Sequence, residues 1–164
     1  MITKNGSLYI NKTCLCRVSG NTGFVDINGN AVTTSMSGSS FNFNTFYTGS
    51  SAGMEVQVGV GDTAPSFNDY KLAEREINGV DISTLIHTSN GGINVDELGQ
   101  YSVSATFTNV SSQSVDIKEV GIVAYTGFGS GQVICLVSRD IIPTKTLAPS
   151  ESVSLTVQLS PLTI

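Results

Sequence analysis

Hydrophobic and polar residues alternate with a period of two along much of this chain. Three segments show the pattern most clearly: Met54–Val60, Tyr101–Phe107 and Val153–Leu159. In each of them an apolar side chain occupies every second position, and Ser, Thr, Gln, Glu or Gly stands between. Successive side chains of a β-strand point to opposite faces of its sheet, so this alternation predicts strands with one buried face.

Apolar runs elsewhere predict further strands, with turn residues between them. These runs are Leu8–Val18, Phe24–Ile27, Val80–His87, Val115–Tyr125 and Val133–Val137. The dipeptide Asn28-Gly29 is a strong signal for a tight turn. Pro143 and Pro149 are expected to bracket the loop before the last strand, because proline fixes its own backbone. The one helical candidate is Ser66–Ala73, since Pro65 suits a first helical turn.

The recurrence of short strands predicts an all-β fold. We expect a single antiparallel β-sandwich, jelly-roll-like, with at most one or two short helical turns. A chain of 164 residues favours one domain, residues 1–164, and can bury a core without metals or disulfides. Within it, residues 1–53 are expected to form irregular N-terminal strands and a candidate assembly segment, and residues 54–160 the regular core.

Composition narrows the range of partners. Only 13% of the residues are charged, about half the usual share of roughly 25%. The eight basic residues are scattered, whereas nucleic acid is bound by clustered Lys and Arg, so no nucleic-acid partner is expected. No apolar run approaches the ~18 residues that a membrane helix needs, so no membrane partner is expected either.

The start of the chain shows no signal-peptide pattern. We therefore expect folding in a cytoplasm, where the Asn-x-Ser/Thr triplets at Asn5, Asn11 and Asn109 stay unmodified.

Cysteine and histidine give little support for a metal or cofactor site. Cys14 and Cys16 lie on one face of a predicted strand and are poorly placed to bridge each other. Cys135 lies in an apolar run, so the cysteines are expected to be small buried hydrophobes. His87 is the one histidine of the chain, and its neighbours form no nucleophile motif. We expect no metal, no cofactor and no enzymatic activity. One alternative stays open, glycosidase chemistry by two carboxylates, because such a pair can lie far apart in the sequence.

Two charged residues lie beside apolar runs. Glu119 is inside "DIKEVGIVAY", and Arg139 follows the run in "LVSRDII". A buried charge needs a partner, and an Arg–Glu pair across neighbouring strands would satisfy both. We expect these two residues to support the fold, either paired directly as a structural ion pair or bonded to the backbone.

The segment Val56–Glu74, "VQVGVGDTAPSFNDYKLAE", begins as a strand and then breaks. Its glycines do not make a phosphate loop, because no Lys follows in place and Pro65 removes an amide. The spacing of Asp62, Asn68 and Asp69 matches no calcium loop. These three residues are expected to cap turns instead.

Aromatic residues gather in Ala31–Gly53, amid small polar residues. Phe41 and Phe43 alternate with Asn, but the alternation breaks at Phe46 and Tyr47. Exposed aromatic patches mark interfaces, so these four residues are candidate assembly contacts. The alternative, that the phenylalanines complete the core, is equally open.

Three stretches resemble a family of tailed-bacteriophage virion structural proteins. They are "VGVGDTAPSFNDYKLAEREI", "TFTNVSSQSVDIKEVGIVAY" and "LVSRDIIPTKTLAPSESVSLTVQLS". The first is similar to the family's strand, Gly-rich turn and Thr-Ala-Pro. The second is similar to its Asn-x-Ser/Thr turn and Ile-x-Glu-Val-Gly strand, and the third to its Arg-Asp strand end, Ala-Pro turn and final strand. The resemblance covers about Val56–Ser160.

The resemblance implies a non-enzymatic virion component made in the host cytoplasm. The family is known through head-fibre, auxiliary capsid and tail-fibre-like proteins. By this resemblance we expect a capsid-attached decoration or head-fibre protein, with other virion proteins as partners and a homo-oligomeric or lattice-bound state. A neck, tail or tail-fibre component is the first alternative. A carbohydrate-binding receptor-recognition module is the second, with stacking faces from Tyr47, Tyr70, Tyr101 and Tyr125, and a glycan depolymerase is the third.

Overall fold

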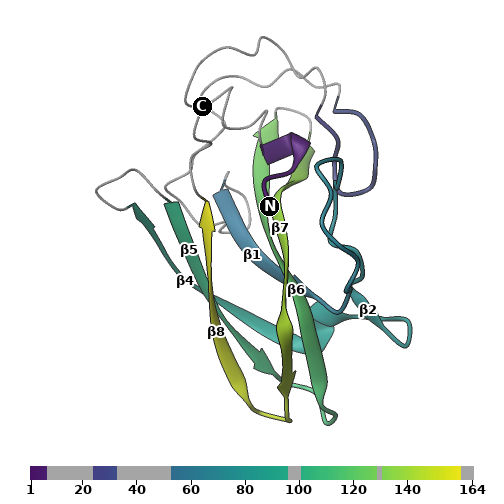
Figure 1. The fold of residues 1–164 in the computed structure, drawn as a ribbon, viewed down its shortest axis with the longest axis vertical. Coiled ribbons are helices and arrows are strands. Elements are labelled where there is room, and N and C mark those ends of the chain that lie inside the picture. The colour runs from purple at the N-terminus through teal and green to yellow at the C-terminus, as the bar shows by residue number, and fades with distance from the viewer. Residues whose placement is uncertain (7–23, 33–52, 96–100, 129–130, 160–164) are drawn as a thin grey trace. The chain divides into compact units, whose positions relative to one another are not determined.

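A computed structural model describes residues 1–6, 24–32, 53–95, 101–128 and 131–159 of the chain (Figure 1). These residues form eight β-strands and the short 3-10 helix η2. The elements are β1 (Gly53–Gly59), β2 (Glu76–Ile77), β3 (Val80–Asp81), η2 (Ile82–Thr84), β4 (Ile86–Val95), β5 (Tyr101–Asn109), β6 (Val115–Phe128), β7 (Gly131–Leu147) and β8 (Ser152–Leu159). The strands make three sheets, with the orders β1-β6-β7, β2-β3 and β4-β5-β8.

The predicted all-β class is confirmed. Helical backbone in the described residues is confined to η2 and to Lys4–Gly6. The strand pairs with a stated register, β2 with β3 and β5 with both β4 and β8, are all antiparallel. The packing of two sheets into a jelly-roll-like sandwich stays a prediction.

Contacts divide the chain into two units, each made of three segments. Unit 1 consists of Met1–Glu55, Pro65–Lys71 and Ile122–Arg139, and unit 2 of Val56–Ala64, Leu72–Gly121 and Asp140–Ile164. The division falls within strands β1, β6 and β7, so each of these strands contributes residues to both units. The predicted division of the chain at residue 53 stays a prediction.

The sheet β4-β5-β8 in unit 2 follows the predicted alternation. Inward-facing side chains of the central strand β5 are fully buried: Val103, Ala105 and Phe107 have 0%, 1% and 0% exposure. Their partners in β8 are Val157, Leu155 and Val153. On the other face, hydroxyl pairs join the same strands, Thr106 with Ser154 at 2.8 Å and Thr108 with Ser152 at 2.7 Å. Figure 1 shows the three strands side by side.

The segment Val80–His87 is not the single strand that its sequence predicts. Asp81 ends β3 and caps η2, since its carboxylate accepts a hydrogen bond from the Ser83 backbone at 2.8 Å. The chain resumes as a strand at Ile86. The preceding hairpin turns at Asn78-Gly79, where both residues have positive φ, 52° and 77°. A two-residue turn of this kind requires that conformation, which Asn and Gly adopt most readily.

Asn109 ties together the strand ends at two turns of unit 2. Its amide nitrogen donates to the carbonyls of Gln113 at 2.7 Å and Leu147 at 2.9 Å. Its side-chain oxygen accepts from the backbone and hydroxyl of Ser111. Both amide hydrogens are therefore used, and the side chain is fully buried. This Asn-x-Ser triplet holds the turns β5–β6 and β7–β8 in place.

The N-terminal residues in unit 1 pair with β7. Ile2 forms an antiparallel bridge with Ser138, and the Thr3 backbone donates to the Val137 carbonyl at 3.0 Å. Asn5, only 2% exposed, holds Val25 at both backbone groups, at 2.6 Å and 3.0 Å. The predicted turn at Asn28-Gly29 is present, with Gly29 at φ 86°. The predicted strand around it is reduced to one bridge between Val25 and Ala31.

Two further expectations about local structure are wrong. Pro143 does not bracket a loop but lies inside β7, which continues to Leu147. Proline is tolerated there because β7 is an edge strand of its sheet, where an amide is not needed for pairing. The helical candidate Ser66–Ala73 forms a turn instead. In that turn the Asp69 backbone donates to the Ser66 carbonyl at 3.1 Å.

Candidate functional site

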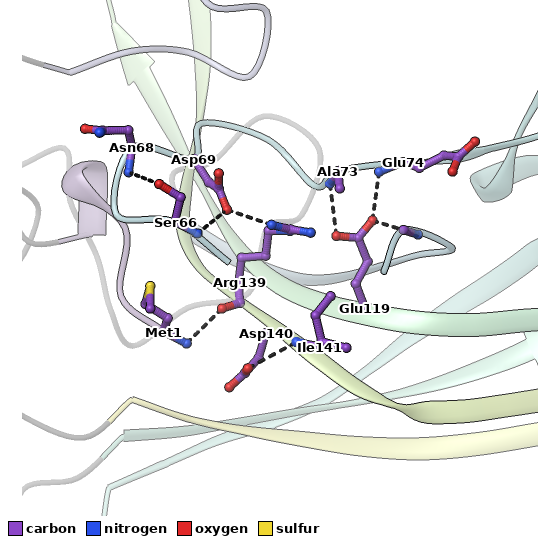
Figure 2. A network of polar contacts seen from close by, with 11 residues as sticks. Met1, Ser66, Asn68, Asp69, Ala73, Glu74, Glu119, Arg139, Asp140 and Ile141 are labelled. Carbon is purple, nitrogen blue, oxygen red and sulfur yellow. Dashed lines mark hydrogen bonds and ion pairs between the residues drawn. The ribbon is translucent and has the colours of Figure 1, made fainter. Parts of the chain in front are cut away.

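Glu119 is a fully buried carboxylate in β6, at 0% exposure. Figure 2 shows it reaching the backbone of a loop in the same unit. Its Oε1 accepts hydrogen bonds from the amides of Glu74 at 2.8 Å and Gly61 at 3.2 Å, and its Oε2 accepts from Ala73 at 2.9 Å. Amide donors replace the water that a buried carboxylate loses. The Glu119 carboxylate thus fastens two backbone segments to β6.

Gly59 and Gly61 leave room for this carboxylate. A Cβ at Gly59 would lie 2.5 Å from Oε1 of Glu119 and 2.5 Å from the carbonyl oxygen of Glu74. A Cβ at Gly61 would lie 2.6 Å from the same Oε1. These distances are shorter than atoms tolerate, so the two glycines serve close approach. In the Gly-rich turn of Val56–Glu74, the space beside the glycines is therefore filled by the side chain of Glu119.

The loop that Glu119 holds also pairs with the end of β1. The Val60 backbone donates to the Glu74 carbonyl at 2.9 Å, and Leu72 is buried at 3% exposure. Arg75 continues the contact, donating to the Gln57 side chain at 3.0 Å and pairing with Asp81 at 3.2 Å. Burial raises the pKa of Asp81, but hydrogen bonds from Ser83 and the charge of Arg75 outweigh it and lower that pKa.

Arg139 is the second buried charge, at 2% exposure, and lies in unit 1. Its Nη1 is 2.7 Å from Oδ2 of Asp69 (Figure 2). The same oxygen accepts from the Ser66 backbone at 2.8 Å, so Asp69 also caps its own turn, as predicted. The backbone of Arg139 exchanges two bonds with Met1, one of them from the terminal ammonium at 2.8 Å. Arg139 therefore holds both the 65–71 loop and the N-terminal segment.

The two charged residues that the sequence singled out are both buried and both bonded within the framework. Glu119 is bonded to backbone amides, which was one of the two expected arrangements. Arg139 has Asp69 as a partner, which the sequence analysis did not foresee. Glu119 and Arg139 belong to different units, and their direct pairing stays a prediction. Asp69 lies far from Arg139 in the chain, and no spacing rule links them.

The structure also describes Cys135, His87 and two of the candidate sugar-stacking tyrosines. Cys135 is 2% exposed, and burial, helped by the charge of Asp26, raises its pKa to about 12. His87 is exposed on β4, opposite Thr108 of β5. Among the candidate sugar-stacking tyrosines, Tyr125 is buried and its hydroxyl donates to Glu55. Tyr70 is 36% exposed and lies against Gly29.

Several candidate residues lie outside the described part of the chain. The candidate assembly contacts Phe41, Phe43, Phe46 and Tyr47 are among them. Cys14 and Cys16 fall there too, and the side chain of Tyr101 is likewise not described. The assignment of the four aromatic residues as interface or core stays a prediction.

A groove of about 360 Å³ lies between the β2–β3 hairpin and the β5–β6 turn in unit 2. Ile77, Val80 and Leu85 form its apolar side, and residues 111–114, three serines and Gln113, form its polar side. Val80 is 43% exposed. No charged side chain lines this groove among the residues that the structure describes.

Within the described ranges, no group of three or more His, Cys, Asp and Glu side chains could hold a metal ion. Among these same residues, no helix has the length and apolarity that crossing a membrane requires. No family model, curated protein or solved structure matches the chain.

Proposed function

We propose that this protein is a non-enzymatic structural component of a tailed-bacteriophage virion, attached to the capsid as a decoration or head-fibre protein. The proposal rests on the three stretches that resemble the phage family and on the positions their residues occupy. A virion component made in the host cytoplasm needs a rigid framework and assembly faces, and its neighbours are other virion proteins.

One observation carries the proposal. The polar residues that stand out in the resembling stretches, Asn109, Glu119 and Arg139, are all at most 2% exposed. Each has hydrogen bonds to backbone or to a side chain of the same unit. A catalytic group must reach a substrate, whereas these groups reach the protein's own turns. The burial and internal bonding of these three side chains favour a structural protein over an enzyme.

The burial of Tyr125 argues against the carbohydrate-binding alternative at that position. A ring that stacks on a sugar must present a face to solvent, and Tyr125 is only 8% exposed. Tyr70 keeps an exposed part, so glycan binding there is a question for experiment. A glycan array probed with the full chain answers it. Binding that Tyr70→Ala abolishes would support the receptor-recognition alternative over the structural role alone.

The location is tested by labelling particles. Tailed particles from the phage that encodes this chain are purified on a density gradient, and the chain is sought by mass spectrometry and immunogold labelling. We expect the chain in the purified particles, with gold on the head. Gold confined to the tail would support the tail alternative and refute a capsid address. Absence of the chain from purified particles would refute the virion role altogether.

A further inference from the structure

Strand β8 is an edge strand of the sheet β4-β5-β8. Its pairing with β5 runs from Ser152 to Leu159. In the part of the chain that the structure describes, no strand pairs with its other side. An edge strand presents unpaired amides and carbonyls, which bind another strand most readily.

Two other edge strands of the larger sheets, β7 and β4, carry features that oppose such pairing. On β7, the Met1–Thr3 segment covers one part, and Pro143 and Lys145 lie further along. On β4, the register shifts between Asn90 and Gly92. Charges, prolines, bulges and covering segments are the usual means of blocking an edge. The sequence of β8, "SVSLTVQL", contains no charge and no proline, and its pairing with β5 has no register shift.

The apolar face of β8 is also incompletely covered. Val153, Leu155 and Val157 are half-buried, whereas their partners in β5 are fully buried. A groove of about 340 Å³ lies beside β8 and is of mixed polarity: Val120, Ile141, Ile142 and Val157 line it together with Asp140, Thr156 and Gln158. A strand added beside β8 would place its inward side chains next to the half-buried Val153, Leu155 and Val157.

We infer that β8 pairs antiparallel with β8 of a second copy of this chain, making a continuous six-stranded sheet across a twofold axis. A partner strand without charge or proline suits this edge, because neither feature then blocks the pairing, and β8 itself is such a strand. Antiparallel pairing of identical strands is self-complementary, as a twofold interface demands. Registers centred on Leu155 or Thr156 keep apolar side chains opposite apolar side chains. Two copies of a chain with net charge −5 can approach along such an uncharged strip.

Charge substitutions on the exposed face of β8 test this inference. Ser154 and Thr156 are exposed, so Ser154→Lys with Thr156→Lys leaves the core intact but places like charges across the axis. Ser154→Glu with Thr156→Glu does the same with the opposite sign. We expect wild type to sediment at twice the monomer mass of 17.2 kDa and each double variant to sediment as a monomer. Mixing the Lys and Glu variants should restore the dimer, because unlike charges then face each other.

The matched control places the same charges on the other edge of the sheet. His87 and Ser89 are exposed on β4 at the same spacing, and His87→Lys with Ser89→Lys should leave the dimer unchanged. Circular dichroism and thermal unfolding verify that every variant is folded. A wild-type monomer at all concentrations, or association that the β8 lysines do not alter, would overturn the inference. Failure of the Lys and Glu variants to pair on mixing would overturn it too. None of these outcomes depends on the virion role.

Discussion

Individual buried polar residues bond the loops of this protein to its strands. Glu119 binds three backbone amides, Asn109 joins two turns, and Arg139 with Asp69 holds a loop. Each is a buried polar group that would be costly if left unbonded. The chain therefore stabilises its long connections by side chains that reach from strands to loop backbone.

Replacing Glu119 by Gln should destabilise the protein. A Gln side chain offers one acceptor oxygen, and its NH₂ group would face an amide that also donates. At least one buried amide is left unbonded, which costs about 1–3 kcal/mol and lowers the melting temperature by roughly 2–4 °C per kcal/mol. Thermal unfolding measures it. Glu74→Gln is the control, since the Glu74 side chain is exposed. Equal melting of both variants would show that the Glu119 carboxylate contributes nothing to stability.

Gly59 should be coupled energetically to Glu119. Gly59→Ala introduces a Cβ too close to Oε1 of Glu119 and to the Glu74 carbonyl, and overpacking of this kind costs about 1–3 kcal/mol. Part of that cost should disappear when Glu119→Ala removes the carboxylate. A double-mutant cycle from denaturant unfolding measures the coupling. Strict additivity of the two changes would mean that the close approach is relieved in another way.

Among the elements, the alternating strands could be predicted, but several strand ends and connections could not. Alternation located β1, β5 and β8, because a half-buried strand repeats every two residues. The break at Asp81 was missed, because a 3-10 turn capped by one carboxylate leaves no periodic signal. Its neighbour Asn78-Gly79 is a hairpin signal that could have shown where β2 turns into β3. The true length of β7 was missed because Pro143 suggests a loop.

For the candidate site, too, one part could be predicted from the sequence and another could not. Burial of Glu119 and Arg139 could be predicted from their apolar neighbours in the sequence. Their partners could not, because Ala73, Glu74 and Asp69 come close only through the folded path of the chain. Sequence spacing carries no record of a contact between a strand and a loop 45 or 70 residues away.

The capped turn at η2 should lose stability in acid. The pKa of Asp81 is lowered below its usual 3.8, so the unfolded chain binds protons more readily than the folded protein. The contribution of Asp81 is therefore present above pH 3.8 and lost as pH falls through the folded-state pKa. Unfolding followed against pH should show a weaker acid dependence for Asp81→Asn than for wild type. An identical acid dependence would mean that Asp81 titrates alike in both states.

For the whole molecule, we propose two surfaces through which the protein associates with other proteins or with a second copy of itself. The first is the edge of β8, and the second is the aromatic segment Ala31–Gly53. Both concern assembly, which suits a building block. The two surfaces consist of different residues, so substitutions can disrupt one surface and leave the other unchanged.

Phe46→Ser with Tyr47→Ser tests the aromatic segment. If the segment is an assembly contact, the variant should stay folded, with unchanged circular dichroism, and lose attachment to particles. Aromatic anchors dominate many interfaces, so the loss should be large. Co-sedimentation with particles measures it, and Tyr70→Ser, at a tyrosine that is 36% exposed, is the control. Unfolding of the double variant would instead assign these aromatics to the core.

The proposal that this chain is a structural part of a phage head can be decided by cryo-electron microscopy of intact particles. We expect density for the sheet β4-β5-β8 on the head surface, repeated with the symmetry of the capsid lattice. Density for these strands on the tail alone, or particles complete without them, would refute the proposal.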